Sequence, residues 1–244
     1  MATEARTRRL SPWARVVTVS AVIVVGSLVA LGAWALASRE KRVVSYDVRG
    51  PVSGVALDLG DGDVKIVGGG RRSGIAVRRS ERFTFGHDAD TRRSVDGSTF
   101  RVRSRCPETV LHSCSVSYTL VVPDNVPVSV RTTSGDVGFD GYRGSAQVDT
   151  TSGDVRMTGF CGFSLQARAE SGAVDVATSC PPPQLSLRTT SGDIHVVVPP
   201  GRYSIDAESS SGSHSFRGVS SGADAPLSIQ ALSNSGDVLV EGRR

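Results

Sequence analysis

Aspartates that directly follow glycine are the residues with the clearest chemical potential in this chain. Carboxylates at regular intervals can hold Ca²⁺, but aspartate also caps tight turns by accepting hydrogen bonds from nearby backbone N–H groups. Ala173 and Ser213 replace the aspartate in two copies of the pattern, which would leave a row of ion sites incomplete. We therefore expect structural caps and no metal ligands at Asp63, Asp136, Asp154, Asp193 and Asp237.

Catalytic patterns are missing from the sequence. None of the four histidines has a serine or carboxylate at the spacing of a nucleophile and its base. The chain contains no Gly-x-Ser-x-Gly elbow, phosphate loop, His-Glu-x-x-His motif or dinucleotide fingerprint. We expect a non-enzymatic protein with no catalytic residues and no cofactor. The threonine pairs, such as Thr150-Thr151, are expected to stack as hydroxyl ladders or, alternatively, to form a flat ligand face.

The aspartates belong to a repeated phrase that determines the expected architecture. Thr-Thr-Ser-Gly-Asp-Val occurs at 132–137 and 150–155, and it ends in Ile at 189–194. Apolar residues recur seven and five residues before each glycine and four after it, with mostly polar residues between. This period-two alternation on both sides of a tight turn predicts about seven two-strand repeats. The expected turn glycines are Gly62, Gly135, Gly153, Gly172, Gly192, Gly212 and Gly236.

The cysteines favour one of two ways to arrange these repeats. Cys161 and Cys180 each lie eight residues after a turn glycine. If equivalent strands stack in parallel, their Cα atoms lie about 5 Å apart, within the range for a disulfide. An antiparallel meander gives no reason for this coincidence. We therefore predict an all-β protein with a parallel β-helix-like solenoid, a Cys161–Cys180 disulfide between two repeats, and a Cys106–Cys114 disulfide closing a local loop.

The N-terminal segments indicate attachment to a membrane. Residues 1–15 form a basic tail, expected in the cytoplasm, and residues 16–37 form an uncharged run long enough for one transmembrane helix. A cleaved signal peptide is the alternative. Residues 38–51 are expected to be a linker and residues 52–244 an extracytoplasmic β-repeat domain. Within this domain, residues 69–122 break the repeat as an irregular insertion, either antiparallel strands or coils.

Charge distribution argues against nucleic acid as a partner. The chain has a net charge of +4, but seven basic residues and two glutamates lie within residues 1–42. The rest of the chain therefore carries −1, and a nucleic-acid-binding domain would need a basic surface.

These repeats behind an N-terminal span resemble a bacterial family of unknown function described as "putative adhesins" with β-strand repeats. The resemblance covers roughly residues 50–244. It implies an extracytoplasmic, solenoid-like β domain and no catalytic residues. We expect a single-pass membrane protein that binds or scaffolds an envelope protein or glycan. A sensor of envelope stress acting through a membrane partner is the alternative, and an enzyme acting on polysaccharides is a further one.

Overall fold

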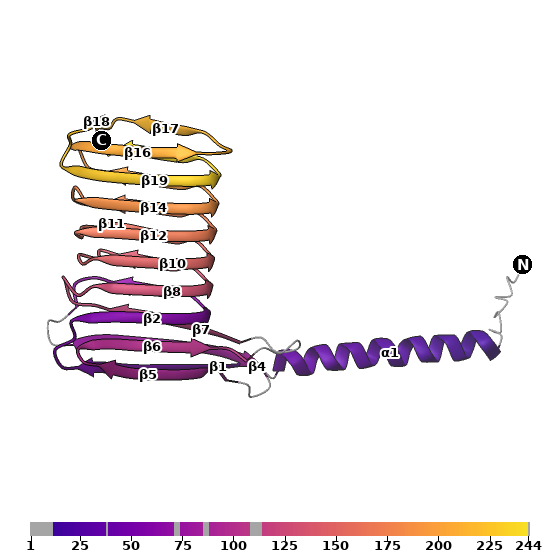
Figure 1. Cartoon of the computed structure of the whole chain (residues 1–244). Coiled ribbons are helices and arrows are strands. Elements are labelled where there is room, and N and C mark those ends of the chain that lie inside the picture. The colour runs from indigo at the N-terminus through magenta and orange to yellow at the C-terminus, as the bar shows by residue number, and fades with distance from the viewer. Residues whose placement is uncertain (1–11, 38, 71–73, 85–87, 108–113, 244) are drawn as a thin grey trace, which may run out of the picture.

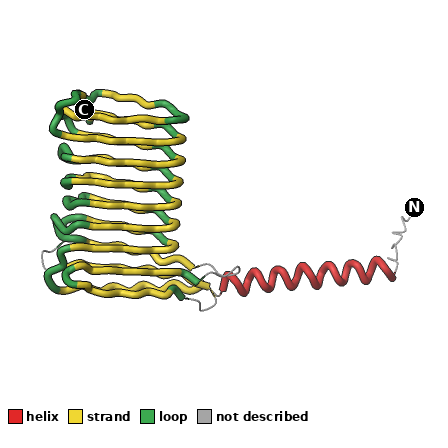
Figure 2. Tube along the Cα trace, viewed as in Figure 1, coloured by secondary structure: helices red, strands yellow, loops and turns green. Residues whose placement is uncertain are grey.

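The computed structural model describes residues 12–37, 39–70, 74–84, 88–107 and 114–243. A single described helix, α1 (Pro12–Ala37), precedes twenty described strands. The strands form two ten-stranded sheets that face each other along the whole stack (Figures 1 and 2). Most of the basic tail predicted at residues 1–15 lies outside the described residues.

The two sheets each have a spatial order that differs from the order in the chain. Sheet A runs β1 (Arg39–Arg49), β4 (Gly74–Thr84), β7 (Cys114–Val121), β3 (Val64–Val67), β9 (Val137–Asp140), β11 (Val155–Phe160), β13 (Val174–Thr178), β15 (Ile194–Val198), β20 (Val238–Gly242), β17 (His214–Arg217). Sheet B runs β18 (Ser220–Ser221), β16 (Arg202–Ser209), β19 (Leu227–Ser235), β14 (Gln184–Ser191), β12 (Ser164–Ser171), β10 (Ala146–Ser152), β8 (Val128–Ser134), β2 (Gly54–Asp61), β6 (Thr99–Arg105), β5 (Asp90–Asp96).

A rung consists of one strand of sheet B, a corner and the following strand of sheet A. Equivalent strands of neighbouring rungs pair in parallel, so the chain forms a β-solenoid-like stack rather than a meander. Alternate side chains point into the space between the sheets. Ala146, Leu165 and Leu185 lie in register and are buried, as the apolar phase of the sequence predicts. The core is therefore a continuous column of aliphatic side chains.

Rungs at both ends are inserted out of chain order. The last rung, β19–β20, lies between β14–β15 and β16–β17. At the other end, β2–β3 lies between β6–β7 and β8–β9. At the C-terminal end the chain therefore returns to insert its last rung, whereas at the other end later strands are added on both sides of an early rung.

Residues 38–51 and 69–122 are more regular than the sequence predicted. Arg39–Arg49 is the strand β1 rather than a linker, and it pairs antiparallel with β4. Its alternating stretch Val43–Val48 supplies the strand pattern. Within residues 69–122, β6 and β7 continue the parallel rungs, whereas β4 and β5 pair antiparallel and close that end. The described part of this section therefore forms a cap with regular pairing and not an irregular insertion.

Both predicted disulfides are present. Cys161–Cys180 joins neighbouring rungs with a Cα–Cα distance of 5.1 Å, and Cys106–Cys114 links the ends of β6 and β7 with a Cα–Cα distance of 5.7 Å. The first distance agrees with the spacing expected for parallel stacked rungs.

The turn glycines form a column along one corner of the stack. Six of the seven predicted turn glycines have positive φ, for example +133° at Gly153. A Cβ at Gly153 would also clash with the carbonyl oxygen of Gly135 in the rung beneath. Gly212 lacks the positive φ, but a Cβ there would meet the carbonyl oxygen of Gly236. Close approach of the backbones therefore requires glycine even where the dihedral angle does not.

The N-terminal helix differs from the expected span in one respect. Judged on the residues that the structure describes, no helix combines the length and apolarity needed to cross a bilayer. The predicted transmembrane helix at residues 16–37 is thus not confirmed.

Candidate ligand-binding face

The turn aspartates connect one rung to the next. Asp136 accepts a hydrogen bond of 2.9 Å from the backbone N–H of Asp154, and Asp154 accepts one of 2.9 Å from that of Ala173. Asp193 accepts from the N–H of Asp237 at 2.8 Å, and Asp63 accepts from the N–H of Asp136 at 3.2 Å. The carboxylates therefore cap the neighbouring turn rather than their own, in a row that we call the Asp column.

The Asp column ends at Ser213 with a stronger cap. Asp237 accepts both the backbone N–H and the hydroxyl of Ser213, at 2.8 and 2.9 Å. These two hydrogen bonds stabilise the carboxylate and lower the pKa of Asp237 below its ordinary value. Among the described residues, no group of three or more potential ligands is arranged to hold a metal ion. The geometry of the column is that of a structural ladder.

The first threonine of each Thr-Thr pair points inward at the same corner. Thr189 donates to the carbonyl of Gly172 at 3.3 Å, and Ser233 donates to that of Gly192 at 3.0 Å. Thr150 is buried, and its hydroxyl has no hydrogen-bond partner among the described residues. The second threonine of each pair is exposed on the outer face of sheet B. The inner hydroxyls therefore bond to the backbone of the neighbouring rung and not to one another, and a ligand face formed by the outer threonines stays a prediction.

A row of charged side chains crosses the outer face of sheet B. In-register pairing places one residue per strand from β6 to β14, and we call this the Arg–Asp row. Acid and base alternate along it until the last two members, which are both arginines. The row runs Arg103, Asp58, Arg131, Asp149, Arg168, Arg188.

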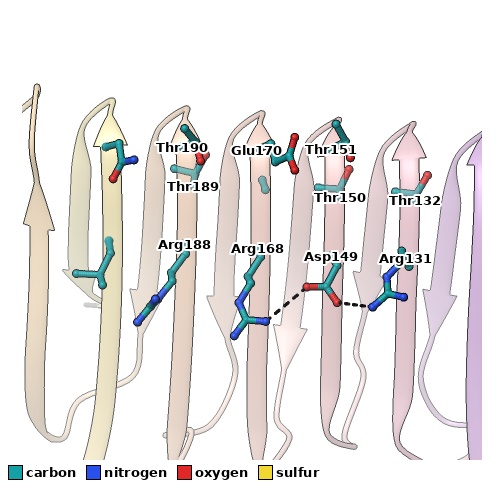
Figure 3. Close-up of a pocket in the computed structure, with 13 residues that line it drawn as sticks. Arg131, Thr132, Asp149, Thr150, Thr151, Arg168, Glu170, Arg188, Thr189 and Thr190 are labelled. Atoms are coloured by element: carbon teal, nitrogen blue, oxygen red, sulfur yellow. Dashed lines mark ion pairs between the residues drawn. The ribbon is translucent and has the colours of Figure 1, made fainter.

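Ion pairs account for the alternating part of the row. Asp149 lies 3.9 Å from Arg131 and 3.8 Å from Arg168, and its side chain is only 23% exposed (Figure 3). Arg188 donates to the amide oxygen of Gln230 at 3.3 Å and has no ion-pair partner among the described residues. Arg168 and Arg188 therefore lie side by side on adjacent strands, and among the described residues only Arg168 of the two has a carboxylate partner.

Asp58 shows the electrostatic effect of the row at its other end. Arg103 and Arg105 donate to its two carboxylate oxygens at 3.0 and 2.6 Å. Burial by itself would raise the pKa of Asp58, but the hydrogen bonds and charges of Arg105 and Arg103 outweigh it and lower the pKa.

A shallow groove of about 570 Å³ lies over the arginine end of the row. The groove is also lined by Thr151, Glu170 and Thr190. Each of these residues lies two positions further along its strand than the member of the Arg–Asp row on that strand (Figure 3). Guanidinium and hydroxyl groups donate hydrogen bonds to carboxylates and other anionic oxygens. The lining holds three arginines against two carboxylates, Asp149 and Glu170, and the groove can therefore bind an anionic group beside Arg168 and Arg188.

The outer face of sheet A carries a second charged row. His195 lies between Asp175 and Glu241, at 3.9 and 3.3 Å, and Arg156 and Arg217 flank these carboxylates at 3.5 and 3.4 Å. Both arginines have a carboxylate partner, so the described residues of this row leave no unpaired guanidinium group for a ligand.

Comparison with known proteins agrees with the fold. The family model described as Toastrack DUF4097 matches residues 112–241. The chain belongs to this family. The Toastrack match covers the parallel rungs from β7 onward, including the groove of sheet B. No curated protein matches the chain.

Solved structures are similar to this chain at low sequence identity. A "putative cell adhesion protein" from Clostridium sporogenes is 12% identical, with 84% of this chain and 100% of that chain covered and a TM-score of 0.52. A "putative adhesin" from Bacteroides fragilis is also 12% identical, with coverage of 84% and 98% and a TM-score of 0.44. The first of these supports the fold and no more.

The Arg–Asp row was not found from the sequence. Its members occupy outward positions of consecutive repeats, four residues before the turn glycines for Asp58, Arg131, Asp149, Arg168 and Arg188. A comparison of the residue four positions before each turn glycine would have revealed the alternation of charge. The apolar inward positions were identified by comparing repeats in the same way.

Proposed function

We propose that this chain is a non-enzymatic, membrane-attached binding protein of the cell envelope, and that it binds an acidic glycan on the outer face of sheet B. The observation that carries the proposal is the adjacent pair Arg168 and Arg188, where the alternation of charge in the Arg–Asp row ends. An anionic group placed there would relieve the repulsion between two like charges on neighbouring strands.

The shape of the face favours an extended ligand over a compact one. Parallel strands repeat at about 4.8 Å, so donors recur at short intervals across a nearly flat surface. The groove is open and shallow, and it is lined mostly by charged residues and threonines. A polysaccharide with carboxylate groups matches this repeated pattern of hydrogen-bond donors. The description of the Clostridium structure as a cell adhesion protein is consistent with such a role.

Two features support a location outside the cytoplasm at a membrane. The two disulfides are typical of oxidising compartments. The described side chains of α1 are apolar except for Ser20 and Ser27, and they are exposed around the helix, for example Val22 at 70% and Val29 at 66%. An apolar helix without protein around it is stabilised by lipid. We therefore propose that α1 attaches the β domain to the membrane, with the sheets on the extracytoplasmic side.

Binding to a model acidic glycan tests the ligand class. The full chain in detergent micelles is titrated with polygalacturonate, with neutral dextran as the comparison. We expect binding to polygalacturonate alone, and the double substitution Arg168→Gln/Arg188→Gln should weaken it at least about tenfold because charge-assisted hydrogen bonds are lost. Arg156→Gln on sheet A is the matched control and should leave binding unchanged.

Three outcomes would overturn the proposal. They are equal affinity for dextran and polygalacturonate, equal loss of binding in the sheet A control, and hydrolysis of the glycan. Membrane attachment is tested separately by flotation of the full chain with lipid vesicles, and a chain that stays at the bottom of the gradient would contradict it.

A further inference from the structure

The end of the stack farthest from β1 has open strand edges. We call this the open end, and it consists of β16, β17 and β18. β17 is the edge of sheet A and pairs with β20 alone among the described strands. β18 covers only Arg202 and Tyr203 of β16, so the rest of β16 has β19 as its one partner among the strands described. Both sheets therefore end in unpaired backbone groups.

The core is also uncovered at the open end. Phe216 lies in register with Val240, which is fully buried, yet Phe216 is 47% exposed. Ile205 lies in register with the buried Ile229 and is itself only partly buried. These side chains hold inward positions that the next rung would cover. Repeat proteins normally cover such positions with a polar terminal unit.

The opposite end of the stack has such a cover. The antiparallel strands β4 and β5 close it, and β1 lies outside β4 as the edge of sheet A. Exposed charged pairs, such as Arg92–Asp90 and Arg101–Asp96, lie on the β5–β6 edge. Charged side chains on edge strands prevent pairing with another chain. Val95 of β5 is 58% exposed in register with the buried Phe100, but head-to-tail stacking would set Phe216 of the open end against a β5 edge that is otherwise lined by these charged pairs.

We infer that the open end pairs with the open end of a second copy of this chain. A two-fold axis parallel to the strands places β17 of each copy beside β16 of the other, running in opposite directions. On the outward positions, β17 carries Arg217, which also lies 3.4 Å from Glu241 of its own copy, and the part of β16 not covered by β18 carries the acidic Asp206 and Glu208. The two edges are therefore complementary in charge, and Phe216 of both copies becomes covered.

The alternative two-fold arrangement is less favourable. An axis perpendicular to the sheets would place β16 beside β16 of the second copy and would set Asp206 and Glu208 of the two copies against each other. Like charges on directly paired strands are destabilising. The β17–β16 contact is also isologous, so the assembly closes as a dimer and does not extend into a filament.

The helix α1 and the open end lie at opposite ends of the stack, and this placement determines where the two helices of a dimer lie. β1 follows α1 directly and lies at the end opposite β17, so the two α1 helices of a dimer belong to opposite ends (Figure 1). Together with the proposed membrane attachment, on which this step rests, the pair would link two membranes. The chain would then be a homophilic adhesin.

Sedimentation velocity of the full chain in detergent micelles tests the dimer. We expect a dimer at micromolar concentration, and Phe216→Asp should weaken it at least about tenfold because a buried carboxylate would have no partner. Phe163→Asp is the matched control, since Phe163 is 64% exposed at the corner between β11 and β12. A wild-type chain that stays monomeric at about 100 μM, or a dimer unaffected by Phe216→Asp, would overturn the inference.

A charge-swap experiment tests the arrangement without relying on the apolar contact. Arg217→Glu alone and Asp206→Lys/Glu208→Lys alone should both weaken the dimer, because each sets like charges on the paired edges. An equal mixture of the two variants should dimerise like the wild type, since both contacts of the mixed pair are complementary. Failure of the mixture to dimerise would refute the β17–β16 arrangement.

Vesicle tethering separates the adhesive role from membrane attachment. Wild-type chain on two populations of lipid vesicles should cluster them, whereas vesicles carrying Phe216→Asp should stay dispersed. Dispersed wild-type vesicles, with the chain still bound to them and dimeric in detergent, would overturn the bridging role. Loss of vesicle binding itself would instead contradict the proposed membrane attachment and leave the dimer intact.

Discussion

The backbone N–H of Asp154 donates a hydrogen bond of 2.9 Å to Oδ1 of Asp136, which lies 18 residues earlier in the chain. The same bond links Asp136 to Asp63 and Ala173 to Asp154, so one side chain per rung satisfies the turn of the rung above it. A residue type that could bind a cation is thereby used to hold the stack in register.

Removal of one carboxylate from the Asp column should cost stability. We expect Asp136→Ala to lower the free energy of unfolding by about 1 kcal/mol, because the N–H of Asp154 loses its acceptor. Asp136→Asn keeps a side-chain oxygen at the same place and should cost less. Chemical denaturation of the three chains checks this, and equal losses for the two variants would show that the hydrogen bond is not the cause.

A methyl group added to the glycine column should be more damaging. Gly153 has φ of +133°, and a Cβ there would clash with the carbonyl of Gly135. We expect Gly153→Ala to lower the free energy of unfolding by about 2–3 kcal/mol. Gly138→Ala in β9 is the control, since its nearest contact would be the carbonyl oxygen of Val64 at 3.8 Å. A control as unstable as Gly153→Ala would disprove the steric argument.

Loss of the bridge between rungs should destabilise the middle of the stack. Cys161→Ser/Cys180→Ser opens a disulfide with a sequence separation of 19, and we expect a cost of about 2–4 kcal/mol in thermal unfolding. Cys106→Ser/Cys114→Ser opens a shorter loop, with a separation of 8, and should cost less on the same scale. Peptide mapping without reduction should recover Cys161 joined to Cys180, and free thiols at both positions would contradict the pairing.

Asp58 should make stability depend on pH in the acidic range. Its pKa in the folded chain is lower than in the unfolded chain, so the unfolded chain takes up a proton first as the pH falls. The stabilisation by Arg103 and Arg105 is therefore fully present above the ordinary pKa of 3.8 and is lost as the pH falls through the folded value. We expect Asp58→Asn to cost about 0.5–1 kcal/mol at pH 7 and almost nothing at pH 2. A difference that stays constant with pH would exclude the ionised carboxylate as its source.

The regular part of the fold was predictable because every rung obeys the same local rules. Alternation of apolar and polar residues set the strands, and the glycines set the corners, as Leu165 and Gly153 illustrate. The shared phase of Cys161 and Cys180 predicted parallel stacking, because only that arrangement brings the two Cα atoms within disulfide range. The Asp column was predicted as caps, although the caps act between rungs and not within one turn.

The arrangement at the ends of the stack and the charged faces required the tertiary structure. Strand pairing uses backbone groups that all rungs share, so nothing local decides that β19–β20 lies between β14–β15 and β16–β17. The residues beside Arg188 could not be predicted for the same reason, because they depend on which strands are neighbours in the sheet. The local sequence pattern alone determined the structure within each rung, because the side-chain period sets its strands and the turn residues set its corner. Only the packing of the whole core decided which rungs are neighbours, and with them the open end and the excess positive charge on sheet B.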